Sequence, residues 1–322
     1  MKSVVVTAYG GPEVLEVRDT PIPEPEAGMV RIAVKAAGVN YADIMQRRGL
    51  YPDGPEPPFG AGFEVAGVVD AVGEGISQWK EGDAVMAFCE AGYSEYVLAP
   101  AQQVMPKPEQ VDFRAAVALP CQGLTAYHAL FTLGGLEAGQ TVLLQAAAGG
   151  LGTLMVQMAR NAGATVFGTA STDEKCALIG KLGCTHPIQY TREDFEERVK
   201  QETDGAGCDL VIETVGGPVL TKSLHCLKMR GMLVTLGVAS GDVTPINPVE
   251  LLANNWIVAG FHLFGYTQDA AAMANAMRDV HNWLLDGTLD VVTEHTFALD
   301  EAAQAHQSIS ERKSRGKVAL IP

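Results

Sequence analysis

A glycine-dense turn in the segment TVLLQAAAGGLG, residues 141–152, holds the side chains and spacing with the clearest capacity for chemistry in this chain. Residues 142–144 form a short apolar run typical of a buried strand, and a helix pattern starts at Leu151. Gly149 and Gly150 have no side chains, so backbone N–H groups at the start of that helix can approach an anion closely. The pattern predicts a cradle for the pyrophosphate of a dinucleotide.

The spacing departs from the common G-x-G-x-x-G fingerprint, because the chain reads Ala147-Ala-Gly-Gly-Leu-Gly152, with alanine in the place of the first glycine. A tight strand-to-helix turn that binds nothing is the alternative interpretation of this segment. The residues that follow decide between the two, because a dinucleotide also needs a second strand and helix.

Residues 165–170 form a second apolar strand, and Ser171 or Thr172 then serves as the N-cap of a second helix. An NAD-specific site carries an acidic residue here, roughly 20 residues beyond the glycine turn, for the ribose hydroxyls. Small hydroxyl residues instead leave room for a 2′-phosphate, and Lys175 lies one helical turn further on. The sequence therefore favours NADPH over NADH. The alternative is that Lys175 is a solvated lysine, as the neighbouring Asp173 would also suggest.

Alternating strands and helices follow the glycine turn, and a β-rich region precedes it. The expected strands of the alternating region are 141–145, 165–170, 186–190, 209–215, 232–238 and 256–262, with helices near 150–162, 172–183, 192–203 and 217–229. The earlier strands are expected at 3–7, 15–18, 29–37, 64–72 and 84–88. The pattern predicts an α/β protein with a doubly wound parallel six-stranded sheet and a small, strongly bent β-rich domain.

The end of the chain is expected to return to the first domain. A helix at 268–286, a helix at 301–311 and a strand at 317–321 carry this return. The predicted domains are therefore 1–118 with 265–322, and 119–264.

Composition excludes several classes of protein. The chain has 322 residues, 47% hydrophobic and 19% charged, which is the profile of a globular protein. A formal charge of −15 argues against binding a nucleic acid backbone, which needs a basic surface. No apolar run reaches membrane-spanning length and the start lacks a long apolar signal region, so we expect a cytoplasmic location. Six cysteines without CxxC pairs predict neither disulfides nor a four-cysteine zinc site.

Seven motifs in order resemble those of the medium-chain dehydrogenase/reductase superfamily, and more narrowly its zinc-free quinone oxidoreductase (zeta-crystallin-like) branch. They are AAGVNYADIMQRRGLYP (36–52), GFEVAGVVDAVGEG (62–75), QGLTAYHAL (122–130), AAAGGLG (146–152), GTASTDEK (168–175), VIETVGG (211–217) and GMLVTLG (231–237). The resemblance implies a GroES-like catalytic domain interrupted by a Rossmann domain, with the active site in the cleft between them. It also implies NADPH-linked reduction of an activated double bond, and a homodimer formed through the last Rossmann strand.

The resemblance also bears on metal. Zinc-bearing relatives use an early cysteine and a Gly-His-Glu triplet, where this chain has Asn40 and Gly62-Phe63-Glu64. These residues do not supply three zinc ligands. Without a Lewis acid, the substrate must already be electrophilic, which indicates a quinone or an α,β-unsaturated carbonyl.

Three polar residues are the catalytic candidates. Tyr51 matches a tyrosine of related enoyl thioester reductases and could donate to the substrate oxygen, while Asn40 and Asp43 match polar residues of the same cleft. Each has a structural alternative: Asn40 as the N-cap of a helix at 41–48, Asp43 as a first-turn carboxylate, and Tyr51 as an aromatic plug.

The resemblance also assigns the cofactor contacts, from the pyrophosphate and 2′-phosphate to the nicotinamide. They are Thr125, Ala148, Gly149, Gly150, Leu151, Ser171, Lys175, Tyr190, Gly237, Val238, Phe261, His262 and Leu263.

Two other functions stay open at this point. An enoyl thioester reductase would need basic residues for a coenzyme A or carrier phosphate, and Arg47 and Arg48 are the neighbouring pair that could supply them. The other alternative is a nucleotide-binding protein with little turnover.

Overall fold

The computed structural model describes all 322 residues and divides into two compact units, Met1–Cys121 with Val291–Pro322, and Gln122–Asp290. The predicted boundary at residue 265 therefore differs from the observed one, because residues 265–290 belong to the second unit. Helix α9 (Ala270–Leu285) packs on α3 (Leu124–Tyr127) through the rings of Trp283 and Tyr127. A hydrogen bond from Tyr127 Oη to Asp279 Oδ2, 2.7 Å long, fixes this contact.

The first unit is the predicted β-rich domain, and its strands pair antiparallel except for the parallel pair β15 and β16. Its main sheet has the order β15-β16-β3-β5-β6-β8, with β7 also pairing with β3, and a smaller sheet has the order β2-β1-β4. The strands are β1 (Lys2–Val6), β2 (Leu15–Asp19), β3 (Met29–Val39), β4 (Phe59–Gly60), β5 (Glu64–Val72), β6 (Ala84–Phe88), β7 (Tyr96–Pro100), β8 (Val104–Pro106), β15 (His295–Ala298) and β16 (Val318–Ile321). Its helices are α1 (Tyr41–Arg47), α2 (Phe113–Ala116) and α10 (Ala302–Ser310).

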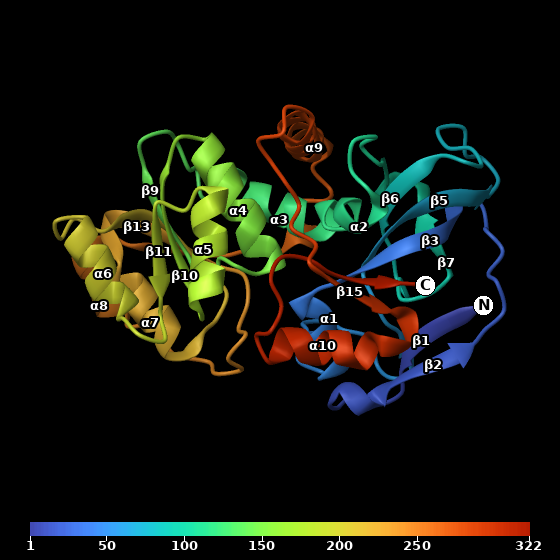
Figure 1. The fold of residues 1–322 in the computed structure, drawn as a ribbon, viewed down its shortest axis with the longest axis horizontal. Coiled ribbons are helices and arrows are strands. Elements are labelled where there is room, and N and C mark those ends of the chain that lie inside the picture. Colours follow the sequence, from blue (N-terminus) through green and yellow to red (C-terminus); the bar gives the residue numbers. More distant parts are fainter. The chain divides into compact units, whose positions relative to one another are not determined.

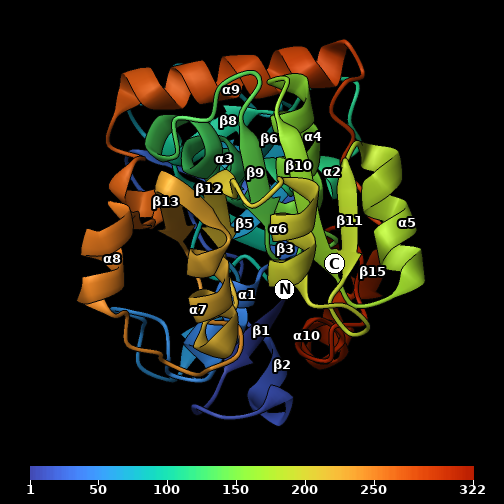
Figure 2. The same cartoon turned by 90° about the vertical axis from the view of Figure 1, so that its left-hand side faces the viewer.

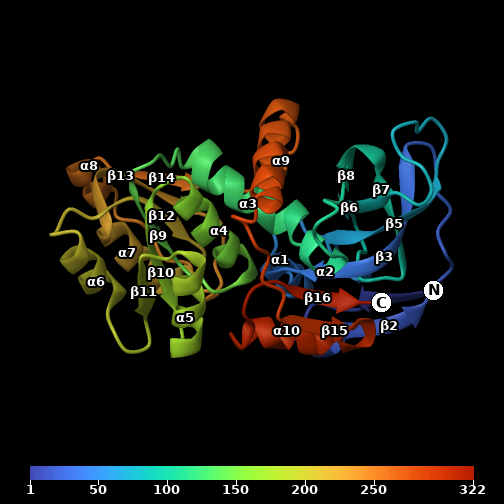
Figure 3. The same ribbon diagram turned by 45° about the horizontal axis from the view of Figure 1, so that its top comes forward.

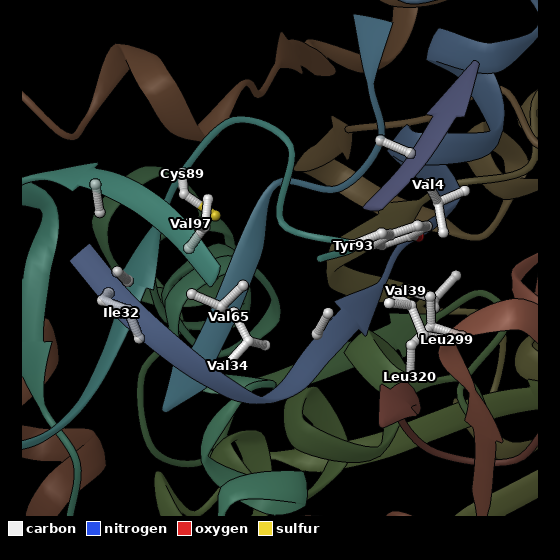
Figure 4. Close-up of a cluster of buried hydrophobic side chains, with 14 of the residues drawn as sticks. Val4, Ile32, Val34, Val39, Val65, Cys89, Tyr93, Val97, Leu299 and Leu320 are labelled. Atoms are coloured by element: carbon white, nitrogen blue, oxygen red, sulfur yellow. The ribbon is translucent and has the colours of Figure 1, made fainter. Parts of the chain in front are cut away.

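The return of the chain to the first unit is real. Strand β16 pairs antiparallel with β3, so the red C-terminal strand lies beside the blue early strand in Figure 3. Buried Val, Ile and Leu side chains of β3, β5 and β16 form the core of this unit with Tyr93 (Figure 4). This core holds the ends of β3, β5 and β16 together, and the polar cluster described below lies at those ends.

The second unit is the predicted doubly wound parallel sheet of six strands, with the order β11-β10-β9-β12-β13-β14. Figure 1 labels β9, β10, β11 and β13 of this sheet. Helices flank this sheet (Figure 2); α4 packs against α5 and α3, and α6 against α7. The strands are β9 (Thr141–Leu144), β10 (Thr165–Ala170), β11 (His186–Gln189), β12 (Cys208–Glu213), β13 (Leu227–Thr235) and β14 (Ile257–Gly260). The helices are α4 (Gly150–Asn161), α5 (Asp173–Leu182), α6 (Phe195–Glu202), α7 (Gly217–His225) and α8 (Pro248–Asn254), besides α3 and α9.

Two predicted boundaries in this unit are wrong. The helix predicted at 217–229 ends at His225, because β13 begins at Leu227, five residues earlier than the predicted 232. A register shift of β12 against β13 between Cys208 and Leu210 accommodates this early start. Helix α8 is not among the predicted helices, although its Asn247 N-cap and first-turn proline are ordinary helix-start signals.

Candidate functional site

The predicted cofactor residues of the second unit fall at one edge of its sheet. Because the six strands are parallel, their carboxyl ends lie at the same edge. Across the sheet from β11 to β14, the residues following the strands run in the order Tyr190, Ser171, Gly149, Gly237 and Phe261. Five strand spacings of about 4.8 Å make this row roughly 24 Å long. The order in which the strands are added reverses between β9 and β12, and such sheets bind their ligands at this point.

The glycine turn after β9 is tightly determined. Ala146 has a φ of +53°, a left-handed conformation that is uncommon for a residue with a side chain. The Thr169 hydroxyl holds it, accepting a hydrogen bond from the Ala146 N–H at 3.2 Å and donating to Gln145 Oε1 at 2.7 Å. A side chain at Gly152 would place its Cβ 2.5 Å from the Ala146 carbonyl oxygen.

Helix α4 starts in this turn without a side-chain cap, because its N-cap is Gly149. The N–H groups of the first turn have no partner within a helix, so they suit an anion. A Cβ at Gly149 would find its nearest heavy atom 3.5 Å away, so the space in front of the turn is open. Ala148 is buried behind it, and Gly150 and Leu151 are half-buried. These residues fit a pyrophosphate.

The predicted 2′-phosphate corner follows β10 and β11. Thr172, not Ser171, is the N-cap of α5, since its hydroxyl accepts a hydrogen bond from the Lys175 N–H at 3.3 Å. The Ser171 carbonyl accepts from the Thr191 hydroxyl at 3.0 Å, which joins the two strand ends. Asp173, the acidic residue that argued against an anion here, is paired with Arg192 at 2.9 Å. Arg192 is not among the predicted residues of this corner, because it belongs to the segment that follows the next strand, β11.

The predicted nicotinamide end follows β13 and β14. Backbone bonds from Leu236 and Ala239 to the carbonyls of Glu213 and Thr214 hold the loop that contains Gly237 and Val238. Phe261 and Leu263 are buried, and His262 between them is exposed.

An aromatic stack supports this end of the row. The Phe261 ring stacks on Tyr266 at 5.0 Å, and Tyr266 stacks on His128 at 5.2 Å. His128 is therefore a packed residue, with 0% of its surface exposed. Thr125 is half-buried one turn before it, on α3.

The first unit contains a buried polar cluster at the ends of β3, β5 and β16. Lys317 Nζ lies 2.6 Å from Glu64 Oε1, and the two side chains are 1% and 0% exposed. Lys317 also donates to Asn40 Oδ1 at 3.0 Å, while Asn40 Nδ2 donates to Glu64 Oε1 at 2.7 Å. The Cys121 N–H donates to the other Glu64 oxygen at 2.7 Å. The Asn40 amide is thus fixed in one orientation by partners on both sides.

Asp43 belongs to the same cluster and is also buried. Its Oδ2 accepts from the Asn40 N–H at 2.6 Å and from the Tyr93 hydroxyl at 3.0 Å, and its Oδ1 has no partner. Burial raises the pKa of Asp43 to about 7, against the lowering effects of the Asn40 N–H and Lys317. Asn40 precedes α1, so the helix-capping alternative is confirmed for both residues.

Tyr51 lies close to this cluster. Its ring packs on that of Phe63 with centroids 5.4 Å apart, which agrees with the aromatic-plug alternative. Burial is the main cause that raises the pKa of Tyr51 to about 12. The phenol is therefore protonated at neutral pH and can donate a hydrogen bond. The structure thus brings Asn40, Asp43 and Tyr51 into one region, and their catalytic roles stay predictions.

Comparison with known proteins agrees with this architecture. The "Alcohol dehydrogenase GroES-like domain" model matches residues 26–109 and the "Zinc-binding dehydrogenase" model matches residues 150–280. A quinone oxidoreductase of Pseudomonas aeruginosa is 37% identical over 100% of this chain and 99% of its own length. This chain belongs to the medium-chain dehydrogenase/reductase superfamily. The predicted quinone oxidoreductase branch of that superfamily is confirmed as well.

Two other members of the superfamily extend this result. A 2-haloacrylate reductase of a Burkholderia species is 35% identical over 99% of this chain and 98% of its length. The crystal structure of Escherichia coli quinone oxidoreductase complexed with NADPH superimposes with a TM-score of 0.95 at 32% identity, covering 100% of both chains.

Zinc, which some members of the superfamily bind, does not fit the donors present here. Asn40 uses its amide on Lys317 and Glu64, and the Glu64 carboxylate already accepts from three donors. Phe63 contributes an aromatic ring in place of a ligand. A Zn²⁺ site needs three or four nitrogen, sulfur or oxygen ligands that are free to coordinate.

One predicted basic pair is wrong. Arg47 is buried and bonded to the Gly10 carbonyl and His306, so it cannot receive a carrier phosphate together with exposed Arg48. The predicted site also lacked Lys317, Tyr93 and His306. No local motif marks these three residues, because they are far along the chain from the cluster. Lys317 is 277 residues from Asn40, Tyr93 is 50 residues from Asp43, and His306 is 263 residues from Asp43.

The raised pKa of Asp43 leads to a prediction on stability. Asp43 is protonated in the fold below about pH 7, whereas an unfolded Asp ionises near pH 4, so its contribution is lost as pH rises between these values. Relative to the wild type, Asp43→Asn should gain about 2 to 4 kcal/mol between pH 4 and pH 7. Urea unfolding at several pH values measures this.

His306 affects stability in the opposite direction. Burial and Arg47 lower its pKa to about 3, so its contribution is lost as pH falls below about 6.5. This slope is common to the wild type and Asp43→Asn, and it cancels in their difference. Exposed Asp53→Asn is the matched control. Parallel pH curves for the wild type and Asp43→Asn would show that Asp43 ionises normally in the fold.

Proposed function

We propose that this protein is an NADPH-dependent oxidoreductase that transfers hydride to a quinone or an α,β-unsaturated carbonyl compound. The observation that carries the proposal is the row of cofactor-type residues along one sheet edge, from Tyr190 to Phe261. The names of the relatives, a quinone oxidoreductase and a 2-haloacrylate reductase, support the two substrate classes. The NADPH complex of the Escherichia coli enzyme supports the cofactor.

Different residues of the chain are proposed to bind the pyrophosphate, the 2′-phosphate and the nicotinamide of the cofactor. The N–H groups at Gly150 and Leu151 receive the pyrophosphate, since no side chain caps α4. Ser171, Lys175 and Tyr190 form the proposed 2′-phosphate site. NADPH, when bound, supplies the hydride. Thr125 and the segments at 237–238 and 261–263 are the proposed contacts for the nicotinamide end.

Reduction leaves negative charge on the carbonyl oxygen of the substrate, and a donor is needed there. Tyr51 is the proposed donor, because its phenol stays protonated with a pKa raised to about 12. Asn40 and Asp43 are proposed to shape the polarity around the reacting group. The Asn40 amide keeps its orientation during the reaction because Lys317 and Glu64 hold both of its ends.

Replacement of Lys175 by alanine tests the cofactor proposal. A charge-assisted hydrogen bond is worth about 1.5 to 3 kcal/mol, so Lys175→Ala should weaken NADPH binding roughly 10- to 150-fold. NADH, which has no 2′-phosphate, should bind as before. Fluorescence titration with both nucleotides measures this, with Lys181→Ala, an exposed lysine on the same helix, as the control. Equal affinity of the wild type for both nucleotides would overturn the assignment of NADPH.

Turnover distinguishes the reductase from a binding protein. NADPH oxidation is followed at the nicotinamide absorbance with quinones, alkenals and enoyl thioesters. Oxidation with quinones or alkenals supports the proposal, and oxidation with enoyl thioesters alone would replace it by the thioester alternative. Tight NADPH binding without any turnover would indicate a nucleotide-binding protein.

The proposal includes a homodimer formed through β14, which is the last strand of its sheet. An edge strand offers unpaired backbone groups, and Leu252 and Ile257 nearby are 78% and 48% exposed. Ile257→Asp should therefore convert a dimer into a monomer in light-scattering measurements. Val17→Asp, at an exposed position of β2, is the control. A wild-type monomer at micromolar concentration would contradict the dimer.

No helix of the structure has the length and apolar character to span a membrane, and the cytoplasmic location stays a prediction.

A further inference from the structure

Four buried side chains of the first unit form a continuous hydrogen-bonded chain. Arg47 Nη1 lies 3.3 Å from His306 Nδ1, His306 Nε2 lies 3.1 Å from Tyr93 Oη, and Tyr93 Oη lies 3.0 Å from Asp43 Oδ2. All four residues are at most 3% exposed. The chain joins a buried cation to a buried carboxyl group through two groups that are neutral at physiological pH, because burial keeps the pKa of His306 near 3 and raises that of Tyr93.

The direction of every hydrogen bond in this chain is determined. A guanidinium can only donate, so His306 Nδ1 accepts from Arg47 and the ring proton is on Nε2. His306 Nε2 therefore donates to the Tyr93 oxygen. The Tyr93 hydroxyl is left to donate to Asp43. All donors point from the cation toward the carboxylate.

Asp43 Oδ2 receives the end of this chain together with the Asn40 N–H, while Asp43 Oδ1 has no partner. An oxygen that already accepts two hydrogen bonds is protonated less readily than an oxygen that accepts none. We infer that Arg47, acting through His306 and Tyr93, positions the Asp43 carboxyl group and makes Oδ1 the oxygen that carries the proton when Asp43 is protonated. The inference deepens the proposed function, because Asp43 is one of the residues proposed to act in it.

Other groups around Asp43 must be considered in any titration. They are Lys317 and Glu64 of the neighbouring ion pair, the hydroxyl of Tyr51, and the thiols of Cys89 and Cys121. Burial raises the pKa of Tyr51 to about 12, and it also raises the pKa of the two thiols. These three groups therefore stay protonated while Asp43 titrates. Tyr93 and His306 stay neutral for the reason given above.

Infrared difference spectroscopy of the full-length protein tests the inference without substrate. The wild type should show the C=O band of a protonated carboxyl group that disappears on ionisation with a midpoint near pH 7, and Asp43→Asn should remove this band. Tyr93→Phe removes one donor to the carboxylate and keeps the ring. Its midpoint should rise by about one pH unit or more.

Two further variants separate the chain from a general charge effect. Arg47→Met should raise the midpoint in the same direction, whereas Arg48→Met removes an equal but exposed charge one residue away and should leave it unchanged. His306→Gln replaces Tyr93→Phe if the latter does not fold. A folded Tyr93→Phe or His306→Gln variant with an unchanged midpoint would overturn the inference, as would the absence of the band in the wild type.

The pH profile of NADPH oxidation gives a second reading. The part of the pH–rate profile that depends on ionisation of Asp43 should shift to higher pH in Tyr93→Phe, by the same amount as the infrared midpoint. A shifted infrared midpoint in a protein without turnover would leave the inference intact and contradict only the proposed function. Turnover in a protein whose infrared midpoint is unshifted would contradict the inference and leave the proposed function intact.

Discussion

Lys317→Met should destabilise the protein by about 3 to 5 kcal/mol, the largest loss we expect from a single side chain. Glu64 would be left as a buried, uncompensated carboxylate, because Lys317 Nζ at 2.6 Å is its only cationic partner. The change would also remove the donor that holds Asn40 Oδ1, so reductase turnover should fall even at temperatures where the variant is folded. Urea unfolding and NADPH oxidation measure the two effects.

A double variant separates charge from shape in this experiment. Lys317→Met with Glu64→Gln removes both charges and should recover much of the lost stability, since an unpaired buried charge no longer exists. Arg114→Met, which breaks an exposed pair with Asp112, should cost at most about 1 kcal/mol. If Lys317→Met and Arg114→Met had equal effects, the buried pair would not be the structural centre of this cluster.

Gly152→Val should both destabilise the second unit and abolish detectable NADPH binding. The new Cβ would lie 2.5 Å from the Ala146 oxygen and 2.6 Å from backbone atoms of Ala147, none of which can rotate away. We expect a loss of about 2 to 4 kcal/mol, typical of a severe steric conflict in a packed region. Thermal unfolding with and without NADPH measures it, and the wild type alone should be stabilised by the nucleotide.

Gly149→Ala is the matched variant in the same turn. Its Cβ would have open space around it, and the φ of −76° suits any residue, so the fold should be as stable as the wild type within about 0.5 kcal/mol. The methyl group would occupy the space proposed for the pyrophosphate, and NADPH binding should weaken. Unchanged NADPH affinity in Gly149→Ala would place the pyrophosphate elsewhere.

The sequence by itself predicted the second unit's sheet and most of its helices, but not strands β7, β8 and β15 or helix α8. Apolar runs of strand length alternate with helix patterns after residue 140, and this local information predicts the six strands and their parallel arrangement. The glycine turn at 149–152 was also readable, because a strand, a turn without side chains and a helix are consecutive in the chain. Helix ends were predicted less accurately. Helix α7 ends at His225 because the residues from Leu227 onward pair with β12 in the sheet, and this pairing is a tertiary contact.

The polar cluster of the first unit was decided by the tertiary structure alone. Lys317 meets Glu64 and Asn40 only because β16 pairs with β3, which brings the end of the chain beside its beginning. Tyr93 and His306 reach Asp43 in the same way, from a loop and from α10. Single residues of this kind carry no periodic or motif signal, because their role depends on contacts with residues that are distant in the sequence. Local patterns therefore predicted most of the elements and the family resemblance indicated Asn40 and Asp43, while long-range pairing decided which side chains contact these two residues.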